Sequence, residues 1–239
     1  MNMHAGLRLL ALRCVVLAML LGAPVRADEA LHNALSAAEQ AEGWQLLFDG
    51  SSLSGWRGYH AAEAPAGWRA EDGTLHRAGS GGDIVTVGSY ADFELSLDWK
   101  VAEGGNSGIF YRAALGEQQI YFSAPEMQVL DDAHHHDGGD PRTSAGAAYG
   151  LYPAPRGVVH PAGEWNHARI RLQHGRVEHW LNGRKLLEYT FGSPDWKARV
   201  AASKFAAWAA YGVAPTGHIG LQDHGDPVWY RDIKIRVLG

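Results

Sequence analysis

The chain has 239 residues and a net charge of −5 at pH 7, from 21 basic and 26 acidic residues. An acidic balance argues against nucleic acid as a partner, because phosphate backbones are bound by clustered lysines and arginines. A single cysteine excludes an internal disulfide framework. Stability must therefore come from a hydrophobic core, and the length suits one sizeable domain.

The first residues predict a secretory signal peptide over residues 1–27. Arg8 and Arg13 precede an apolar run at residues 14–21, and a small-residue cleavage site ends at Ala27. This run is too short and wrongly flanked for a membrane span, and no second long apolar run follows. We expect cleavage after Ala27, loss of the one cysteine with the leader, no membrane span, and a periplasmic or secreted protein.

The next residues predict an N-terminal arm followed by a β-rich domain. Residues 28–42 form the arm, in which a capping box at residues 36–39 begins a short helix that stops at Gly43. A first strand is expected at residues 44–48. The Asp-Gly pair at residues 72–73 predicts a hairpin turn.

The remaining strands are predicted by alternating apolar and polar residues, or by short apolar runs between turn residues. An Asn-Gly pair at residues 182–183 predicts a second hairpin, and residues 194–211 predict helical or irregular structure. In chain order the strands cover residues 83–87, 93–101, 109–112, 125–132, 147–152, 166–172, 177–181, 185–189, 217–223 and 229–237.

These elements predict an all-β fold. About a dozen short strands with little helix and no βαβ alternation favour an antiparallel sandwich or jelly roll, as one domain over residues 43–239. Nine tryptophans, nine tyrosines and thirty glycines suit such a protein, and flat amphipathic rings suit one that handles sugars. Most of the tryptophans are nevertheless expected in the core.

The strand at residues 125–132 places Glu126 and Gln128 on one face and Met127 and Val129 on the other, because strand side chains alternate. The apolar pair is expected in the core. Glu126 and Gln128 then line either a solvated outer face or a groove, and the groove is favoured because a cationic strand is expected beside them.

Several blocks of the sequence resemble the 3-keto-disaccharide hydrolase domain family, from about Gly43 to Leu238. The resemblance implies a concanavalin A-like jelly roll of two curved antiparallel sheets, with the ligand on the concave face. It also implies activity on glycosides already oxidised to a ketone at C3 by a separate sugar oxidoreductase. The blocks that carry it are residues 47–56, 105–112, 163–166, 178–183, 203–205 and 217–225.

A more distant resemblance links the central strand to laminarinase-type glucanases, whose catalytic strand reads E-x-D-x-x-E. Here these positions are Glu126, Gln128 and Asp131. Gln in place of the middle Asp and Asp in place of the last Glu point away from hydrolysis by paired carboxylates, which must lie about 5–5.5 Å apart in a retaining enzyme.

A ketone at C3 makes the C2 proton acidic, so that a base can remove it and the C1 substituent can leave by β-elimination. Such a site needs a base, a cation or donor for the enolate oxygen, and an acid for the leaving oxygen. Glu126 or Asp131 could be the base, and Glu126 is favoured. Arg112 and Lys204 are the candidate cations, and His224 or a histidine of residues 134–136 is the candidate acid.

Other polar and aromatic side chains are candidates for binding the sugar. They are Asn106, Gln128, Tyr149, Trp180, Gln222 and His134. A divalent metal could be held by residues 134–136 with Asp131 or Asp137, although adjacent histidines lack the spacing of established metal motifs, and a solvated loop is the competing interpretation. Arg112 could instead form a structural ion pair with Glu126, Lys204 could lie free on the surface, and Trp180 could belong to the core.

The sequence therefore favours an exported enzyme that acts on 3-keto-glycosides, by elimination or by net hydrolysis. A non-catalytic, lectin-like carbohydrate-binding module is the alternative from another class, since this fold serves both purposes. An ordinary glycosidase acting on unoxidised glucans is a third and weaker reading.

Overall fold

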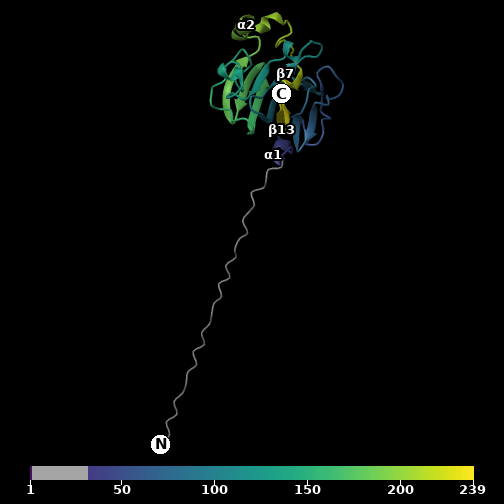
Figure 1. Ribbon diagram of the computed structural model, residues 1–239, viewed down its shortest axis with the longest axis vertical. Helices are drawn as coiled ribbons and strands as arrows, with labels where there is room; N and C mark the ends of the chain where they lie inside the picture. Colours follow the sequence, from purple (N-terminus) through teal and green to yellow (C-terminus); the bar gives the residue numbers. More distant parts are fainter. Residues whose placement is uncertain (2–31) are drawn as a thin grey trace. The chain divides into compact units, whose positions relative to one another are not determined.

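The computed structural model describes residue 1 and residues 32–239; the predicted signal peptide and the cleavage site after Ala27 lie outside these described residues. Residues 32–239 form one compact unit of two antiparallel sheets (Figure 1). The expected all-β sandwich is confirmed.

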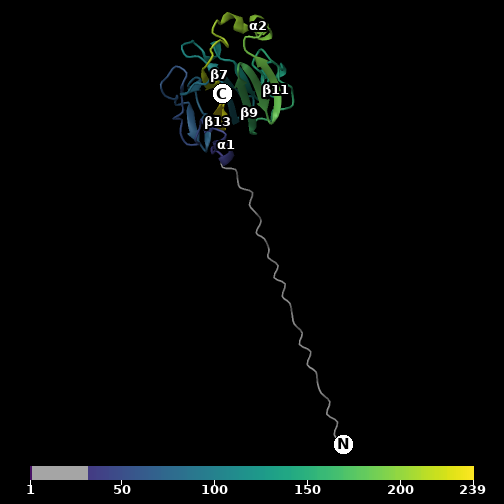
Figure 2. The same cartoon turned by 180° about the vertical axis from the view of Figure 1, so that it is seen from behind.

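The larger sheet has eight strands in the order β11-β10-β9-β6-β13-β4-β3, and β1 also pairs with β13. Seen from behind, β11 lies at the edge of this sheet and β9 lies further in (Figure 2). Its strands are β1 (Trp44–Leu46), β3 (Trp68–Glu71), β4 (Thr74–Arg77), β6 (Phe93–Val101), β9 (Asn166–Gln173), β10 (Arg176–Leu181), β11 (Arg184–Thr190) and β13 (Val228–Val237).

The smaller sheet has five strands in the order β2-β5-β12-β7-β8. They are β2 (Trp56–Gly58), β5 (Ile84–Thr86), β7 (Asn106–Ala113), β8 (Glu126–Leu130) and β12 (His218–Leu221). The strand expected at residues 147–152 is instead a loop that makes only isolated bridges, at Ala148.

Both predicted hairpins form, and for the expected reason. Asp72 and Gly73 have φ of 48° and 70°, and Asn182 and Gly183 have φ of 48° and 78°. Two consecutive residues with positive φ are the signature of a type I′ turn, which matches the twist of the strands that it joins. These turns fix the register of β3 with β4 and of β10 with β11.

Little of the described chain is helical. The capping box of Ser36 and Glu39 forms as expected and begins α1 (Ala37–Ala41), which buries no residue. The second helix, α2 (Pro194–Ala201), begins at the N-cap Ser193 and lies at the opposite end of the sandwich from α1. Three short 3₁₀ helices complete the list, η1 (Ile120–Phe122), η2 (His136–Gly139) and η3 (Lys204–Ala207).

The core between the sheets is formed by the inward faces of β6, β7, β9 and β13, and its largest fully buried side chains include Trp99, Tyr111 and Tyr230. Met127 and Val129 of β8 belong to this core. Because side chains alternate along a strand, Glu126 and Gln128 must then face away from the core, on the outer face of the smaller sheet. The fold thereby places the functional candidates of β8 over that outer face.

Candidate functional site

A polar cavity of about 240 Å³ lies over the outer face of the smaller sheet, next to β7, β8 and the end of β12. At about 30 Å³ per water molecule, it has room for about eight waters, which is the space of one sugar ring. Seven residues predicted for the site form its wall together with Tyr121 and Phe205. The full set is Asn106, Tyr121, Glu126, Gln128, Tyr149, Lys204, Phe205, Gln222 and His224.

Glu126 is the carboxylic acid of this cavity. Its side chain is 8% exposed and lies over Gly108 of the neighbouring strand β7. A Cβ atom at Gly108 would approach Glu126 Oε1 to 2.1 Å, so only glycine leaves room for the carboxyl group in this position. Within residues 32–239, neither carboxyl oxygen has a hydrogen-bond partner; both are therefore available to a ligand.

Burial raises the pKa of Glu126 from its ordinary value of 4.5 to about 8. The positive charge of Lys204 acts in the opposite direction, and the negative charges of Asp83 and Asp137 add to the increase. A carboxyl group with a pKa close to neutrality can both accept and return a proton at physiological pH, which is what a general base requires.

Three amide side chains point polar atoms into the same cavity without partners. Asn106 and Gln128 are 3% and 1% exposed. Among the described residues, Asn106 Oδ1, both polar atoms of Gln128, and Gln222 Oε1 form no hydrogen bond. Buried polar groups without partners cost about 1–3 kcal/mol each, so these amides indicate a site built for a ligand with many hydroxyl groups.

Lys204 brings the positive charge to the cavity. Ser203 Oγ accepts a hydrogen bond from the amide of Phe205 (3.2 Å) and thereby caps the short helix η3 that carries Lys204. Phe205 stacks on Tyr211 with ring centroids 4.2 Å apart, which fixes this turn against the core. Lys204 Nζ lies 4.6 Å from the centre of the Tyr149 ring.

Tyr149 and His224 complete the polar wall. The Tyr149 hydroxyl donates a hydrogen bond to Asp137 Oδ2 (3.3 Å), and burial together with the charge of Asp137 raises the pKa of Tyr149 to about 12. His224 follows β12 on a loop, with a half-exposed side chain 4.0 Å from Asp226. It lines this cavity and the neighbouring one described below.

Asp131 and His134 lie outside the cavity and are bound to each other. Asp131 Oδ2 is 2.7 Å from His134 Nδ1 and accepts a hydrogen bond from the Gly104 amide, while Oδ1 accepts one from the Ala133 amide. Burial acts to raise the pKa of Asp131, but these hydrogen bonds outweigh it and lower the pKa. The two residues stabilise the loop after β8, and the structure does not support Asp131 as the base or His134 as a sugar ligand.

Arg112 also lies away from the cavity and does not pair with Glu126. A β-bulge shifts the register of β7 against β12, between the pairs of His218 and Gly220, and Arg112 itself has φ of +52°. An extra residue in one strand reverses the alternation of faces. The Arg112 guanidinium therefore lies 3.7 Å from Asp92 and over the Phe191 ring, and the expectation that it stabilises the enolate is not supported.

Trp180 belongs to the other sheet and not to the sugar site. It lies on β10, where the Arg169 guanidinium stacks over its ring at 4.3 Å and its indole nitrogen donates to Glu178. The alternation of β9 and β10 keeps this group of charged side chains on the outside of the larger sheet. A strand motif alone does not say which sheet the strand joins.

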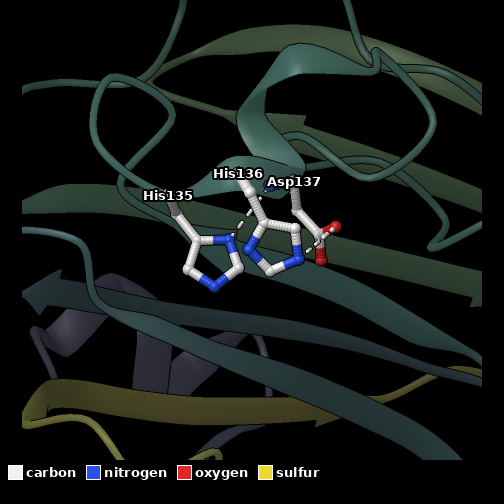
Figure 3. A group of neighbouring side chains, drawn as sticks. All are labelled: His135, His136 and Asp137. Carbon is white, nitrogen blue, oxygen red and sulfur yellow. Dashed lines mark hydrogen bonds and ion pairs between the residues drawn. The ribbon is translucent and has the colours of Figure 1, made fainter.

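His135, His136 and Asp137 place ligand atoms within 4.8 Å of one another, at the start of η2 (Figure 3). The sequence had suggested Asp137 or Asp131 as the carboxylate of such a group, and the structure brings in Asp137. His135 Nδ1 already accepts a hydrogen bond from the Asp137 amide, and the His136 side chain is 83% exposed. Three donors of this kind could hold a zinc ion with an open fourth position.

Two aromatic residues of the cavity wall were not predicted. Tyr121 lies in η1 and packs against Trp208, with ring centroids 5.4 Å apart. Phe205 was noted only as part of a block with Lys204. No hydrophobic periodicity or motif spacing marks these two residues in the sequence. Each lies in a short 3₁₀ helix, and only the tertiary packing of that helix brings the residue to the cavity.

Comparison with known proteins identifies the family. Residues 43–236 match the 3-keto-alpha-glucoside-1,2-lyase-like domain. The chain belongs to this family. A 3-keto-disaccharide hydrolase of Bacteroides thetaiotaomicron is 37% identical, with 86% of this chain and 82% of the relative covered.

Solved structures agree with this assignment and with the fold. A “putative glycosyl hydrolase” from Parabacteroides distasonis is 36% identical with a TM-score of 0.82, and the alignment covers 87% of this chain and all of the other. A Bacillus subtilis protein with a galectin-like fold matches at 15% identity and a TM-score of 0.50, over 87% of this chain and 94% of its own. The second likeness concerns the fold alone and supports the sandwich architecture.

Proposed function

We propose that the protein cleaves 3-keto-glycosides by removing the proton at C2 and eliminating the substituent at C1. The observation that carries the proposal is Glu126, a buried and unpartnered carboxyl group with a pKa raised to about 8, in a polar cavity of the size of one sugar ring. The membership of the chain in the 3-keto-alpha-glucoside-1,2-lyase-like family supports the same chemistry.

In this mechanism Glu126 takes the C2 proton, and the electron pair of the C–H bond forms an enolate across C2 and C3. The charge of Lys204 stabilises the enolate oxygen. The C1–O bond then breaks, its electron pair goes to the leaving oxygen, and His224 supplies the proton to that oxygen. The products are an unsaturated keto sugar and a free alcohol, and addition of water to the double bond would complete a net hydrolysis.

Asn106, Gln128 and Gln222 hold the substrate in this scheme. Their unpartnered polar atoms are positioned to hydrogen-bond the hydroxyl groups of the sugar ring. Orientation is important because elimination requires the C2–H bond to lie against Glu126. The group at His135, His136 and Asp137 takes part in no step of the mechanism.

An ordinary retaining glycosidase is a weaker alternative. It needs two carboxyl groups about 5–5.5 Å apart, and among the described residues that line the cavity Glu126 is the one carboxylic acid. A lectin-like module would bind sugar through neutral groups and aromatic rings, and has no use for a desolvated carboxyl group beside a lysine. Both alternatives remain outcomes of the experiment below.

The purified protein should be offered a 3-keto-glucoside and its parent glucoside, each with a chromogenic leaving group. We expect release from the keto compound alone. Release from both compounds would favour the ordinary glycosidase, and binding without release from either would favour the lectin-like module. The same assay with a chelator decides whether the group at His135 contributes a metal to the reaction.

The proposal also includes the cellular setting. We propose, from the predicted signal peptide of residues 1–27, that the enzyme acts in the periplasm or outside the cell, on a substrate that a separate oxidoreductase supplies by oxidising C3. Fractionation of cells that express the full chain tests the location, and an enzyme found uncleaved in the cytoplasm would contradict it. In the described part of the chain, no helix is both long and apolar enough to cross a membrane.

A further inference from the structure

A second cavity, of about 450 Å³, lies directly beside the proposed catalytic cavity. The two share a wall formed by Tyr121, Gln222 and His224. The first cavity has the space of one sugar ring, so the rest of a glycoside bound there must extend into a neighbouring space. Because His224 stands on the shared wall, the bond that breaks would lie at the junction of the two cavities.

Asp83 is a half-buried acid in the wall of the second cavity, and the proposed mechanism does not use it. It follows Gly81 and Gly82 at the start of β5, and its Oδ1 accepts a hydrogen bond from the Asp223 amide (2.8 Å). In residues 32–239 the other oxygen, Oδ2, has no hydrogen-bond partner. The carboxyl group is thus fixed in place with one acceptor atom open.

The neighbours of Asp83 leave its charge uncompensated. Arg77 binds Asp223 (2.6 Å), and the Asp223 carboxylate also accepts hydrogen bonds from the amides of Gly81 and Gly82. The Asp223 carboxylate is therefore satisfied, whereas no cation of residues 32–239 forms an ion pair with Asp83. Burial raises the pKa of Asp83 to about 6. The hydrogen bond from the Asp223 amide opposes this increase, the negative charge of Asp223 adds to it, and His60 opposes it.

We propose that the second cavity binds the leaving group of the glycoside, and that Asp83 selects leaving groups with hydroxyl groups by accepting their hydrogen bonds. This inference rests on the proposed function, which it extends from the sugar that is cleaved to the group that departs. A partly buried carboxylate with an open acceptor keeps part of its desolvation cost, and a ligand that donates to it offsets that cost. An apolar leaving group cannot make this bond, whereas a second sugar or another polyol can.

The aromatic lining agrees with a sugar in this position. Tyr121 lies between the cavities, and Tyr59 lines the second one with its hydroxyl already bound to the Ala114 carbonyl (2.6 Å). Rings held in this manner present an apolar face, and a pyranose ring combines an apolar face with hydroxyl groups at its edge. Asp83 and His60 would meet the edge of the ring.

The test compares a 3-keto-disaccharide with methyl 3-keto-glucoside, which lacks the second sugar, in the wild type and in Asp83→Asn. The side-chain oxygen of asparagine can still accept the hydrogen bond from the Asp223 amide, so we expect the fold to be preserved. The substitution removes the negative charge of Asp83. We expect kcat/KM for the disaccharide to fall about 10-fold to 100-fold, as for the loss of a charged hydrogen bond. The value for the methyl glycoside should fall much less, because Asp83 acts on that substrate only through its charge on Glu126. Asp72→Asn in the exposed β3–β4 hairpin is the matched control.

Equal losses on both substrates, or no loss on the disaccharide, would overturn the leaving-group site. If the wild type releases neither alcohol, the proposed function fails, and a binding measurement then decides the inference separately. Free glucose is titrated into the full chain by NMR. The inference stands if glucose perturbs the His60 signals of the wild type but not those of Asp83→Asn, and it fails if the two proteins respond alike.

Discussion

Replacing Glu126 with glutamine should change how the stability of the protein depends on pH. The substitution keeps the size of the side chain and removes the charge. In the folded protein the pKa of Glu126 is raised to about 8, against an ordinary value of 4.5. A carboxyl group of this kind stabilises the fold fully below pH 4.5, and this contribution is lost as the pH rises through about 8.

The size of the effect follows from these two values. A difference of about 3.5 between them corresponds to about 5 kcal/mol at 1.36 kcal/mol per unit of pKa, and entry of water into the cavity makes this an upper value. The wild type therefore loses up to about 5 kcal/mol between pH 4.5 and pH 9 through this one group. Glu126→Gln does not, so at pH 9 it should be the more stable protein.

Urea unfolding at pH 5 and at pH 9 measures the difference directly, because all other titrating groups are common to both proteins. The control is Glu164→Gln, at an exposed position ahead of β9, which should follow the wild type at both values. If the wild type and Glu126→Gln keep the same difference in unfolding free energy at pH 5 and pH 9, then Glu126 ionises freely in the folded protein. That result would contradict the raised pKa on which the assignment of Glu126 as the general base depends.

Three further outcomes follow from the cavity. Turnover of Glu126→Gln on a 3-keto-glycoside should fall about 10²–10⁴-fold, and an unchanged rate would assign the base to another residue. Gln128→Leu should raise KM while leaving the protein as stable or making it more stable by about 1–3 kcal/mol, since two unpartnered polar atoms are removed; a clear loss of stability in urea would contradict this. Lys204→Met should lower kcat about 10²-fold, because it removes the positive charge that stabilises the enolate. The control Lys197→Met, at an exposed position, should keep the wild-type rate. Equal rates for the two variants would show that Lys204 takes no part in the mechanism.

The strand pattern was sufficient to predict which face of β8 carries Glu126 and Gln128, the central residues of the candidate site. Alternation along β8 places Met127 and Val129 in the core, and this alone directs Glu126 and Gln128 to the outer face. Lys204 was found only through a sequence block shared with the family. Its position depends on a capped 3₁₀ turn and an aromatic stack, which no periodicity encodes.

Three candidate residues lie away from the cavity, for physical reasons that a sequence pattern does not contain. Arg112 was assumed to follow the alternation of β7, and a bulge at that point turns it toward Asp92. Asp131 was a candidate base, but its carboxylate accepts hydrogen bonds from the amide of Ala133 in its own loop and from the amide of Gly104 between β6 and β7. Trp180 lies on the sheet that does not carry the cavity.

Asp83 was not singled out from the sequence at all, because its significance comes from residues far away in the chain. It meets Asp223 across 140 positions and shares its cavity with Tyr121. A polar residue between a Gly-Gly pair and a buried strand was the one local signal. Cavities on the outside of a sandwich collect residues from several loops, so their composition follows from the topology and not from any single segment.

The fate of the C2 hydrogen tests the central claim most directly. The 3-keto-glycoside is turned over by the wild type in D₂O, the reaction is stopped early, and C2 of the sugar product is examined by NMR, with substrate incubated alone as the control for spontaneous exchange. Proton abstraction by Glu126 predicts that the original C2 hydrogen is lost in every turnover, and that a hydrated product carries deuterium at C2. A product that retains its original hydrogen at C2 would show that the glycosidic bond is broken by direct displacement, and would contradict the mechanism.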